Sequence, residues 1–348
     1  MASSIFFLRP PPPLPTSLSA LPKLGASRAN GFLPRRAAFP VPIHLFHEPS
    51  EPLSVLYGKG RRSAFTCFYD AKEKLKTASP EKSLGVEWPI LQRWNVPWKW
   101  QTVVLTMAAC GISFVLTGLV EASVLPYLGF QGGDVTLDEK AEILFAGQFT
   151  VTAVVLGVIY GITNTYQPFP DDLFCYDLKE PFKLQNGWLL WAAIGLVGAL
   201  IAIALAGVVL TSVNGETPQR ETDALIRLLP LIGSSSISTA CLVGITGVLA
   251  PVLEETVFRG FLMASLTKWF PTPVSVLVSA AVFALAHLTP GEFPQLFVLG
   301  AALGLSYAQT RNLLTPITIH AFWNSGVILL LTVLQLQGYD IKELLQAY

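Results

Sequence analysis

Charged residues are scarce in this chain of 348 residues, because 13% are charged whereas 52% are hydrophobic. Soluble proteins carry roughly twice that charged share, so the composition argues against a soluble globular fold. Basic and acidic residues are equal in number, and the formal net charge is zero. The basic excess is confined to residues 1–100. No broad basic surface remains in the rest of the chain, which argues against nucleic acid as a partner.

Cysteine and histidine are also few. The four cysteines show neither a CxxC pair nor the spacing of a zinc site, so the sequence predicts neither a disulfide framework nor a cysteine-bound metal. Of the four histidines, His44 and His47 lie near the N-terminus, whereas His287 and His320 lie inside apolar runs. Ionisable groups at membrane depth are costly, and these two imidazoles are therefore candidates for a functional site.

Acidic residues are absent from Met1 to His47, where basic residues are interspersed with Ser, Ala, Leu and Pro. This composition is typical of an organellar transit peptide, and the opening Met-Ala-Ser-Ser favours a plastid. We expect residues 1–65 to be a disordered, cleaved transit peptide and the mature protein to reside in a chloroplast membrane, either envelope or thylakoid. The alternative is an uncleaved Pro-rich tail. Residues 66–100 form a polar segment that ends in Trp98-Lys99-Trp100, a pattern typical of a membrane edge.

Seven stretches lack charged residues and are each long enough for a helix that crosses a membrane, which needs about 17–25 residues. They are residues 102–120, 143–170, 184–215, 228–253, 269–291, 293–310 and 312–339. Backbone groups in lipid must be hydrogen-bonded internally, and the alternation typical of a barrel is absent. The sequence therefore predicts an all-α, polytopic transmembrane bundle of about seven to eight spans. The eighth would arise if Gly260–Phe270 were re-entrant or extended the preceding helix.

Small residues recur at a spacing of four in several of these stretches. Such repeats allow helices to approach closely, so they predict packing and carry no functional weight. The pairs are Gly157 with Gly161, Gly195 with Ala199, Gly198 with Ala202, and Gly300 with Gly304.

An acidic pair ends the long uncharged run before residue 254. Because residues four apart share a helix face, Glu255 can pair with Arg259, while Glu254 points about 100° away around the helix axis. Glu254 is then the freer carboxylate, and an apolar setting makes a carboxylate a better base. Taken alone, this pattern is an ordinary ion pair of a helix surface.

Two further groups of polar residues follow the acidic pair. Phe283 and His287 share a helix face, so the phenyl ring can shield the imidazole from lipid. His320 and Asn324 also share a face, where their donors suit an oxyanion site. Each group alone is a common structural feature, but the three occur together on separate helices that can converge in a bundle core.

The motifs resemble those of the CAAX prenyl protease and bacteriocin-processing (CPBP) family of intramembrane proteases. They are Glu254-Glu255-x-x-x-Arg259, Phe283-x-x-x-His287 and His320-x-x-x-Asn324. The resemblance covers residues 228–336 and has no departing motif position. Residues 101–227 are then accessory transmembrane helices, and residues 337–348 are a C-terminal tail.

The resemblance implies a role for each motif residue. Glu254 would be the general base and His287 its partner in positioning a water. His320 and Asn324 would stabilise the oxyanion, while Glu255 and Arg259 would orient the site. The implied activity is that of an intramembrane endopeptidase, which hydrolyses a peptide bond of a membrane-associated protein in the lipid bilayer. The sequence does not identify the substrate.

Several alternatives compete with this interpretation. A catalytic zinc could be held by Glu254, His287 and His320, but no His-Glu-x-x-His helix is present and Asn324 would have no ligand role, which favours a metal-free site without a cofactor. A serine nucleophile is less favoured, because the serines at 234–236 and 238 lack a Gly-x-Ser-x-Gly elbow. A non-proteolytic plastid membrane scaffold or chaperone-like regulator would keep the motif residues as a polar core. A transporter would need a polar path or an inverted repeat.

Overall fold

The structure, a computed structural model, describes residues 89–128, 135–214, 231–232 and 234–339. Within these ranges the chain is helical and contains no β-strand, which confirms the predicted fold class. The predicted transit peptide, residues 1–65, lies outside the described residues, as do residues 66–88 of the polar segment and residues 340–348 of the C-terminal tail.

The seven predicted stretches each correspond to a helix in the described ranges, and short 3₁₀ turns lie beside several of them. The helices are α2 (Trp100–Val124), α3 (Leu137–Thr163), α4 (Trp188–Asn214), a composite helix from α6 to α8 (Ser236–Leu266), α9 (Thr272–Ala286), α10 (Phe293–Thr310) and α11 (Leu314–Leu336). The 3₁₀ turns are η2 (Pro89–Leu91), η3 (Leu125–Leu128), η4 (Asn164–Tyr166) and η7 (Pro290–Glu292).

Five helical stretches of the described chain are long and apolar enough to cross a membrane. They are Trp100–Tyr127, Leu137–Tyr166, Trp188–Ser212, Ser236–Leu266 and Leu314–Leu336. The sequence predicted seven to eight spans, which is more than these five. The difference arises because α9 has only 15 residues and α10 is not among the five. Residues from Gly260 onwards extend the preceding helix to Leu266 and do not form a separate re-entrant segment.

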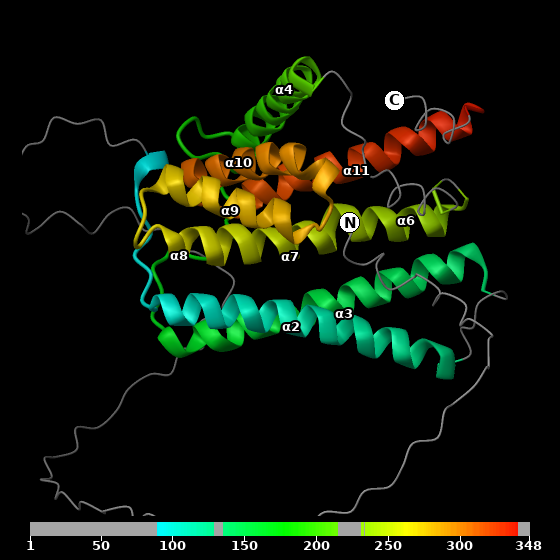
Figure 1. Cartoon of the computed structure of the whole chain (residues 1–348), viewed down its shortest axis with the longest axis horizontal. Helices are drawn as coiled ribbons and strands as arrows, with labels where there is room; N and C mark the ends of the chain where they lie inside the picture. Colours follow the sequence, from blue (N-terminus) through cyan, green and yellow to red (C-terminus); the bar gives the residue numbers. More distant parts are fainter. Residues whose placement is uncertain (1–88, 129–134, 215–230, 233, 340–348) are drawn as a thin grey trace, which may run out of the picture. The chain divides into compact units, whose positions relative to one another are not determined.

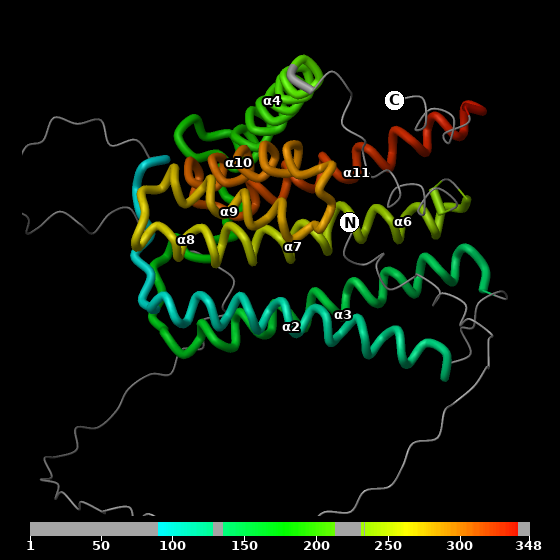
Figure 2. Tube along the Cα trace, in the orientation of Figure 1, coloured from blue at the N-terminus to red at the C-terminus, as the bar shows by residue number. Residues whose placement is uncertain are grey.

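The composite helix lies at the centre of the packing. It contacts α3 on one side and both α9 and α11 on the other, and α2 packs along α3 (Figure 1). Helix α10 packs against α9, and α4 lies across α10 and α11. The trace in Figure 2 runs without a break from α6 through α7 to α8. The polar motifs of the sequence all lie on the composite helix, α9 and α11 or at their ends.

The segment before α2 is fixed to the end of the composite helix by its tryptophans. Trp98 is completely buried, and its indole Nε1 donates to Ser265 Oγ at 2.7 Å. Lys268 Nζ donates to the carbonyl oxygens of Val96 and Trp98 at 3.1 and 2.7 Å. Trp100 is exposed. Trp100 is therefore free to lie at a membrane edge, whereas Trp98 is part of the protein core.

The small-residue repeats divide into close contacts and open positions. A Cβ on Gly300 would lie 3.1 Å from the backbone of α9, and one on Gly304 would lie 2.9 Å from Val276 of α9. A Cβ on Gly157 or Gly161 would meet nothing within 4 Å. The packing prediction is therefore right for the contact between α9 and α10 and wrong for the pair in α3.

Candidate active site

The acidic pair lies at the end of α7 (Ala250–Glu255), which is flanked by two π-helical segments, η5 (Ile245–Leu249) and η6 (Thr256–Met263). A π-helix bonds each N–H to the carbonyl five residues earlier, which widens the helix and shifts the direction of the side chains that follow. Such segments are frequent at functional sites. Their position on both sides of the two glutamates marks this part of the helix as irregular.

Pro251 explains one feature of the first π-helical segment. The N–H of Ala250 bonds to the carbonyl of Ile245, five residues earlier. The next bond of this kind would join residue 251 to the carbonyl of Thr246, but proline has no N–H. The carbonyl of Thr246 instead accepts from Asn324 Nδ2 on α11 at 3.4 Å. The interruption of the helix thus supplies an acceptor that orients Asn324.

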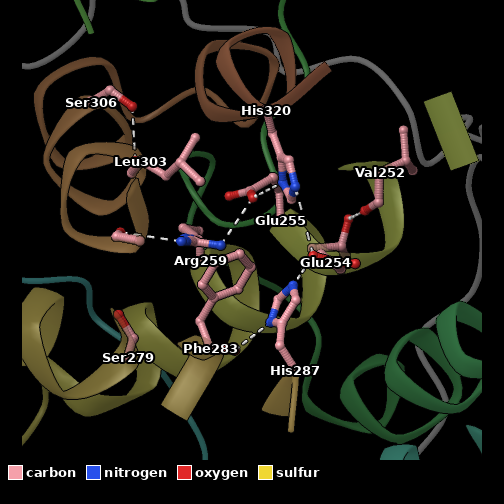
Figure 3. A network of polar contacts seen from close by, with 12 residues as sticks. Val252, Glu254, Glu255, Arg259, Ser279, Phe283, His287, Leu303, Ser306 and His320 are labelled. Carbon is pink, nitrogen blue, oxygen red and sulfur yellow. Dashed lines mark hydrogen bonds and ion pairs between the residues drawn. The ribbon is translucent and has the colours of Figure 1, made fainter. Parts of the chain in front are cut away.

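Glu255 and Arg259 form a completely buried ion pair. Arg259 NH1 donates to Glu255 Oε1 at 2.9 Å, and NH2 donates to the carbonyl oxygen of Gly300 on α10 at 3.1 Å. His320 Nδ1 lies 2.7 Å from the same oxygen of Glu255 (Figure 3). A carboxylate oxygen can only accept, so Nδ1 of His320 carries the proton. The predicted pairing of Glu255 with Arg259 is observed, and it includes His320.

Glu254 faces both imidazoles. Its Oε2 lies 3.8 Å from His287 Nε2 and 3.7 Å from His320 Nε2. Dashed lines mark both contacts in Figure 3. This oxygen is buried and has no hydrogen-bond partner among the described residues, although the side chain as a whole is 19% exposed. The two distances are too long for direct hydrogen bonds but short enough for one bridging water.

The tautomer of His287 follows from its own partner. His287 Nδ1 lies 2.8 Å from the carbonyl oxygen of Phe283, which can only accept, so Nδ1 is protonated. The neutral ring then presents the lone pair of Nε2 to Glu254. Nδ1 of His320 also carries a proton, so in both rings Nε2 is the nitrogen that faces this carboxylate oxygen.

Phe283 separates these polar groups from the rest of the bundle. Its ring is completely buried, with ring centroids 4.7 Å from His287 and 5.9 Å from His320. The guanidinium carbon of Arg259 lies 4.3 Å from the centre of the ring. Aromatic faces attract cations, so Phe283 holds Arg259 in place and also shields the imidazoles, as its spacing from His287 predicts.

The structure brings five of the six predicted site residues into one network of contacts. Asn324 is half-buried one turn after His320, and its amide nitrogen donates to the carbonyl oxygen of Thr246. Each amide nitrogen has two protons, so the second remains available to a ligand. The carbonyl of Gly300 is a site group that the sequence assigned only to packing. The repeat of Gly300 and Gly304, which predicts a close helix contact, was the sequence feature that could have indicated this carbonyl.

The zinc alternative can be tested on the same three side chains. Glu254, His287 and His320 offer suitable donor atoms, but in the described part of the chain no three such side chains lie close enough together to hold a metal ion. Zinc therefore stays an alternative that an experiment has to decide.

The serines before the acidic pair have structural roles in the described chain. Ser235 is the N-cap of α6, where its hydroxyl accepts from the N–H of Ser238 at 3.0 Å. Ser238 is buried and donates to the carbonyl of Leu231 at 2.8 Å. Side chains at an N-cap satisfy free backbone groups, which accounts for these residues without a nucleophile.

Comparison with known proteins identifies the region that holds these groups. Residues 236–326 match the family model of the type II CAAX prenyl endopeptidase Rce1-like proteins. The match contains all six predicted site residues and ends within the predicted range 228–336. No solved structure matches the chain at a significant level.

Two curated bacterial proteins are similar to larger parts of the chain. The membrane-embedded CAAX protease MroQ of Staphylococcus aureus is 28% identical over 163 residues, which are 44% of this chain and 61% of MroQ. The putative membrane peptidase YdiL of Bacillus subtilis is 23% identical over 217 residues, 62% of this chain and 83% of YdiL. The chain thus spans about three fifths of the length of MroQ. Residues 236–326 are thus similar to the Rce1-like CAAX proteases.

Proposed function

We propose that this protein is a multi-pass membrane endopeptidase that hydrolyses a peptide bond of a membrane-associated protein with a water activated by Glu254. The observation that carries the proposal is the buried Oε2 of Glu254, which has no hydrogen bond within the described ranges and faces the Nε2 atoms of His287 and His320 at 3.8 and 3.7 Å. The family match and the five helices that could span a membrane support the broader assignment as a membrane protease.

The chemistry begins with the orientation of one water. A water between Glu254 Oε2 and His287 Nε2 donates one proton to each, because both atoms are acceptors in this arrangement. Its lone pairs then remain free to attack a carbonyl carbon. As the new C–O bond forms, Glu254 takes a proton from the water and the carbonyl electrons become an oxyanion. When the C–N bond breaks, Glu254 returns this proton to the departing amine.

His320 and Asn324 are the proposed oxyanion donors. Since Glu255 already accepts the Nδ1 proton of His320, the ring can donate from Nε2 only when it is doubly protonated. The carboxylate of Glu255, bonded to Nδ1, stabilises such an imidazolium, because Glu254 holds a proton while the oxyanion exists. Asn324 offers the amide proton that Thr246 does not use. Donors fixed before the reaction stabilise developing charge most effectively.

The substrate and the membrane are further parts of the proposal. The N-terminal composition supports a chloroplast membrane, envelope or thylakoid, reached with the transit peptide at residues 1–65. Prenylated CAAX proteins are made in the cytosol, so a plastid protein would act on other membrane-associated proteins. The proposed site works without a metal, and the Glu254, His287 and His320 set is the one that a chelator would affect if zinc took part.

Cleavage in reconstituted membranes tests the proposal. The full chain in liposomes is incubated with plastid membrane proteins, and new protein N-termini are read by mass spectrometry. Glu254→Gln keeps the shape of the side chain and removes the base. Glu180→Gln, in an exposed ion pair with Lys183, is the matched control. A parallel sample contains a zinc chelator.

The expected result is a set of termini that the wild type and Glu180→Gln produce and Glu254→Gln does not. Loss of the termini in the chelator sample would contradict the metal-free site. Identical profiles in all samples would refute the protease and favour the scaffold. The scaffold would keep the same residues as a polar core, and its partners could then be sought by cross-linking.

A further inference from the structure

The loop between η4 and α4, residues 167–187, lies outside the family match but contacts the composite helix. Tyr176 OH in this loop lies 2.7 Å from Thr256 Oγ1, and Tyr160 OH of α3 lies 3.1 Å from Tyr176 OH. Thr256 follows Glu255 directly and begins η6. The loop therefore reaches the helix one residue after the acidic pair.

The protons of the three hydroxyls can be assigned from their partners. Thr256 Oγ1 donates to the carbonyl oxygen of Val252 at 2.6 Å, which uses its single proton. Thr256 therefore accepts from Tyr176, and Tyr176 in turn accepts from Tyr160. Burial raises the pKa of the Tyr176 hydroxyl above its ordinary value, so it remains a donor at neutral pH. The chain of bonds ends on the helical turn that carries the two glutamates.

The residues on both sides of Tyr176 are bound to the turn between α10 and α11. The N–H of Leu313 donates to the carbonyl oxygen of Cys175 at 2.8 Å. Asn312 Nδ2 donates to the carbonyl oxygen of Asp177 at 2.6 Å. Helix α11, which carries the second imidazole of the site, begins immediately after this turn. Tyr176 thus connects the start of α11 with the helix that carries the glutamates.

A second aromatic side chain of the loop packs against η6. Phe174 has a φ of 54°, in the left-handed region that bulky side chains rarely adopt. A Cβ on Gly260 would lie 3.0 Å from Phe174 Cδ1 and 3.1 Å from Leu313 Cδ1. Glycine at 260 is therefore what lets the loop approach so closely. The neighbours of the π-helical segment restrict its position at both Thr256 and Gly260.

We propose that Tyr176 is a positioning residue for the candidate active site, where it holds the turn Val252–Thr256 so that Glu254 faces His287 and His320. The inference rests on the proposed function, because positioning matters only if these groups react. Tyr176 touches none of the reacting groups and acts through Thr256. Its loss is therefore expected to slow the chemical step and to leave substrate binding nearly unchanged.

The first experiment measures cleavage by the full chain in liposomes. The probe is a peptide that spans a cleavage site identified by the terminus mapping above. Tyr176→Phe should lower kcat about tenfold and change KM less than about twofold. Thr256→Val should have a similar effect, and the double variant should lose no more. Tyr166→Phe is the matched control, because it removes a tyrosine hydroxyl bonded to Thr102, away from the acidic pair.

The second experiment does not depend on activity. Histidine labelled with ¹⁵N in the ring is incorporated into the full chain, and the His320 signal is assigned by its loss in His320→Gln. Tyr176→Phe should shift the ring nitrogen signals of His320, whose Nδ1 contacts Glu255, and Tyr166→Phe should not. This measurement reports on positioning even if the wild type cleaves no plastid protein, which would refute the proposed function alone.

Three results would overturn the inference. One is a kcat for Tyr176→Phe within about twofold of the wild type. Another is an equal loss of kcat in Tyr166→Phe, which would indicate a general loss of stability. The third is an unshifted His320 signal in Tyr176→Phe.

Discussion

The buried pair of Glu255 and Arg259 provides the sharpest test of the site. Both side chains are completely buried, and Arg259 also bonds the carbonyl of Gly300. Replacing Arg259 with Met leaves Glu255 without this counter-charge, and breaking a buried pair in this way costs about 3–5 kcal/mol. Glu255→Gln leaves the guanidinium buried and should cost a similar amount.

The double variant Glu255→Gln/Arg259→Met buries neither charge. Its loss of unfolding free energy should therefore be smaller than the loss of about 3–5 kcal/mol in either single variant, and far from their sum of about 6–10 kcal/mol. The difference is the coupling between the two residues. Lys183→Met is the control, because its partner Glu180 is exposed, and surface pairs contribute about 0–1 kcal/mol.

Unfolding free energies can be measured by SDS titration in mixed micelles, with circular dichroism as the signal. If the losses of unfolding free energy in Glu255→Gln and Arg259→Met add up in the double variant, the two residues do not stabilise the protein as one electrostatic unit. Cleavage assays on the same proteins separate stability from activity. The double variant should remain at least about tenfold less active than the wild type, because a neutral residue at 255 no longer stabilises the imidazolium of His320.

Three other substitutions test individual features. Gly300→Ala should destabilise the protein by about 1–3 kcal/mol, because the new Cβ meets the α9 backbone. Gly198→Ala is the control, because a Cβ there has open space and should not lower the unfolding free energy measured by SDS titration. Leu288→Gly should stabilise the protein by about 1 kcal/mol by relieving a φ of 55°, and a lower unfolding free energy would contradict this. Asn324→Ala should lower kcat about 100-fold and cost under about 1 kcal/mol of stability, because its bond to Thr246 is long.

The fold was largely predictable because its signal is local. Charge-free runs of sufficient length mark the helices, and each run corresponds to a helix in the described chain. The ends were less predictable. The run at 269–291 contains a helix of only 15 residues, because Leu288 turns into the left-handed region directly after His287. Trp98 was placed at a membrane edge on composition, but it is buried against Ser265, a contact over 167 residues that no local pattern contains.

The candidate site was predictable where its geometry depends on one helix. The spacing of four between Glu255 and Arg259 predicts their pairing, and the pair is observed. The approach of Glu254 to His287 and His320 joins three helices; the motifs showed only that these helices can converge, and the resemblance to a family suggested which side chains meet. Local patterns also could not show that His320 uses Nδ1 to bond Glu255, because this depends on how α11 packs against the composite helix.

The contact between Asn324 and the carbonyl of Thr246 could have been predicted from Pro251. A proline inside a long apolar run lacks an N–H and leaves a carbonyl of the preceding turn without its helical partner. In lipid a free carbonyl must be satisfied by a neighbouring helix. Asn324 is one of the polar side chains on the later apolar helices that can donate to it. It does bond the freed carbonyl of Thr246. Through this bond the proline fixes the position of α11 along the helix that carries the glutamates. An oxyanion donor opposite Glu254 requires this alignment.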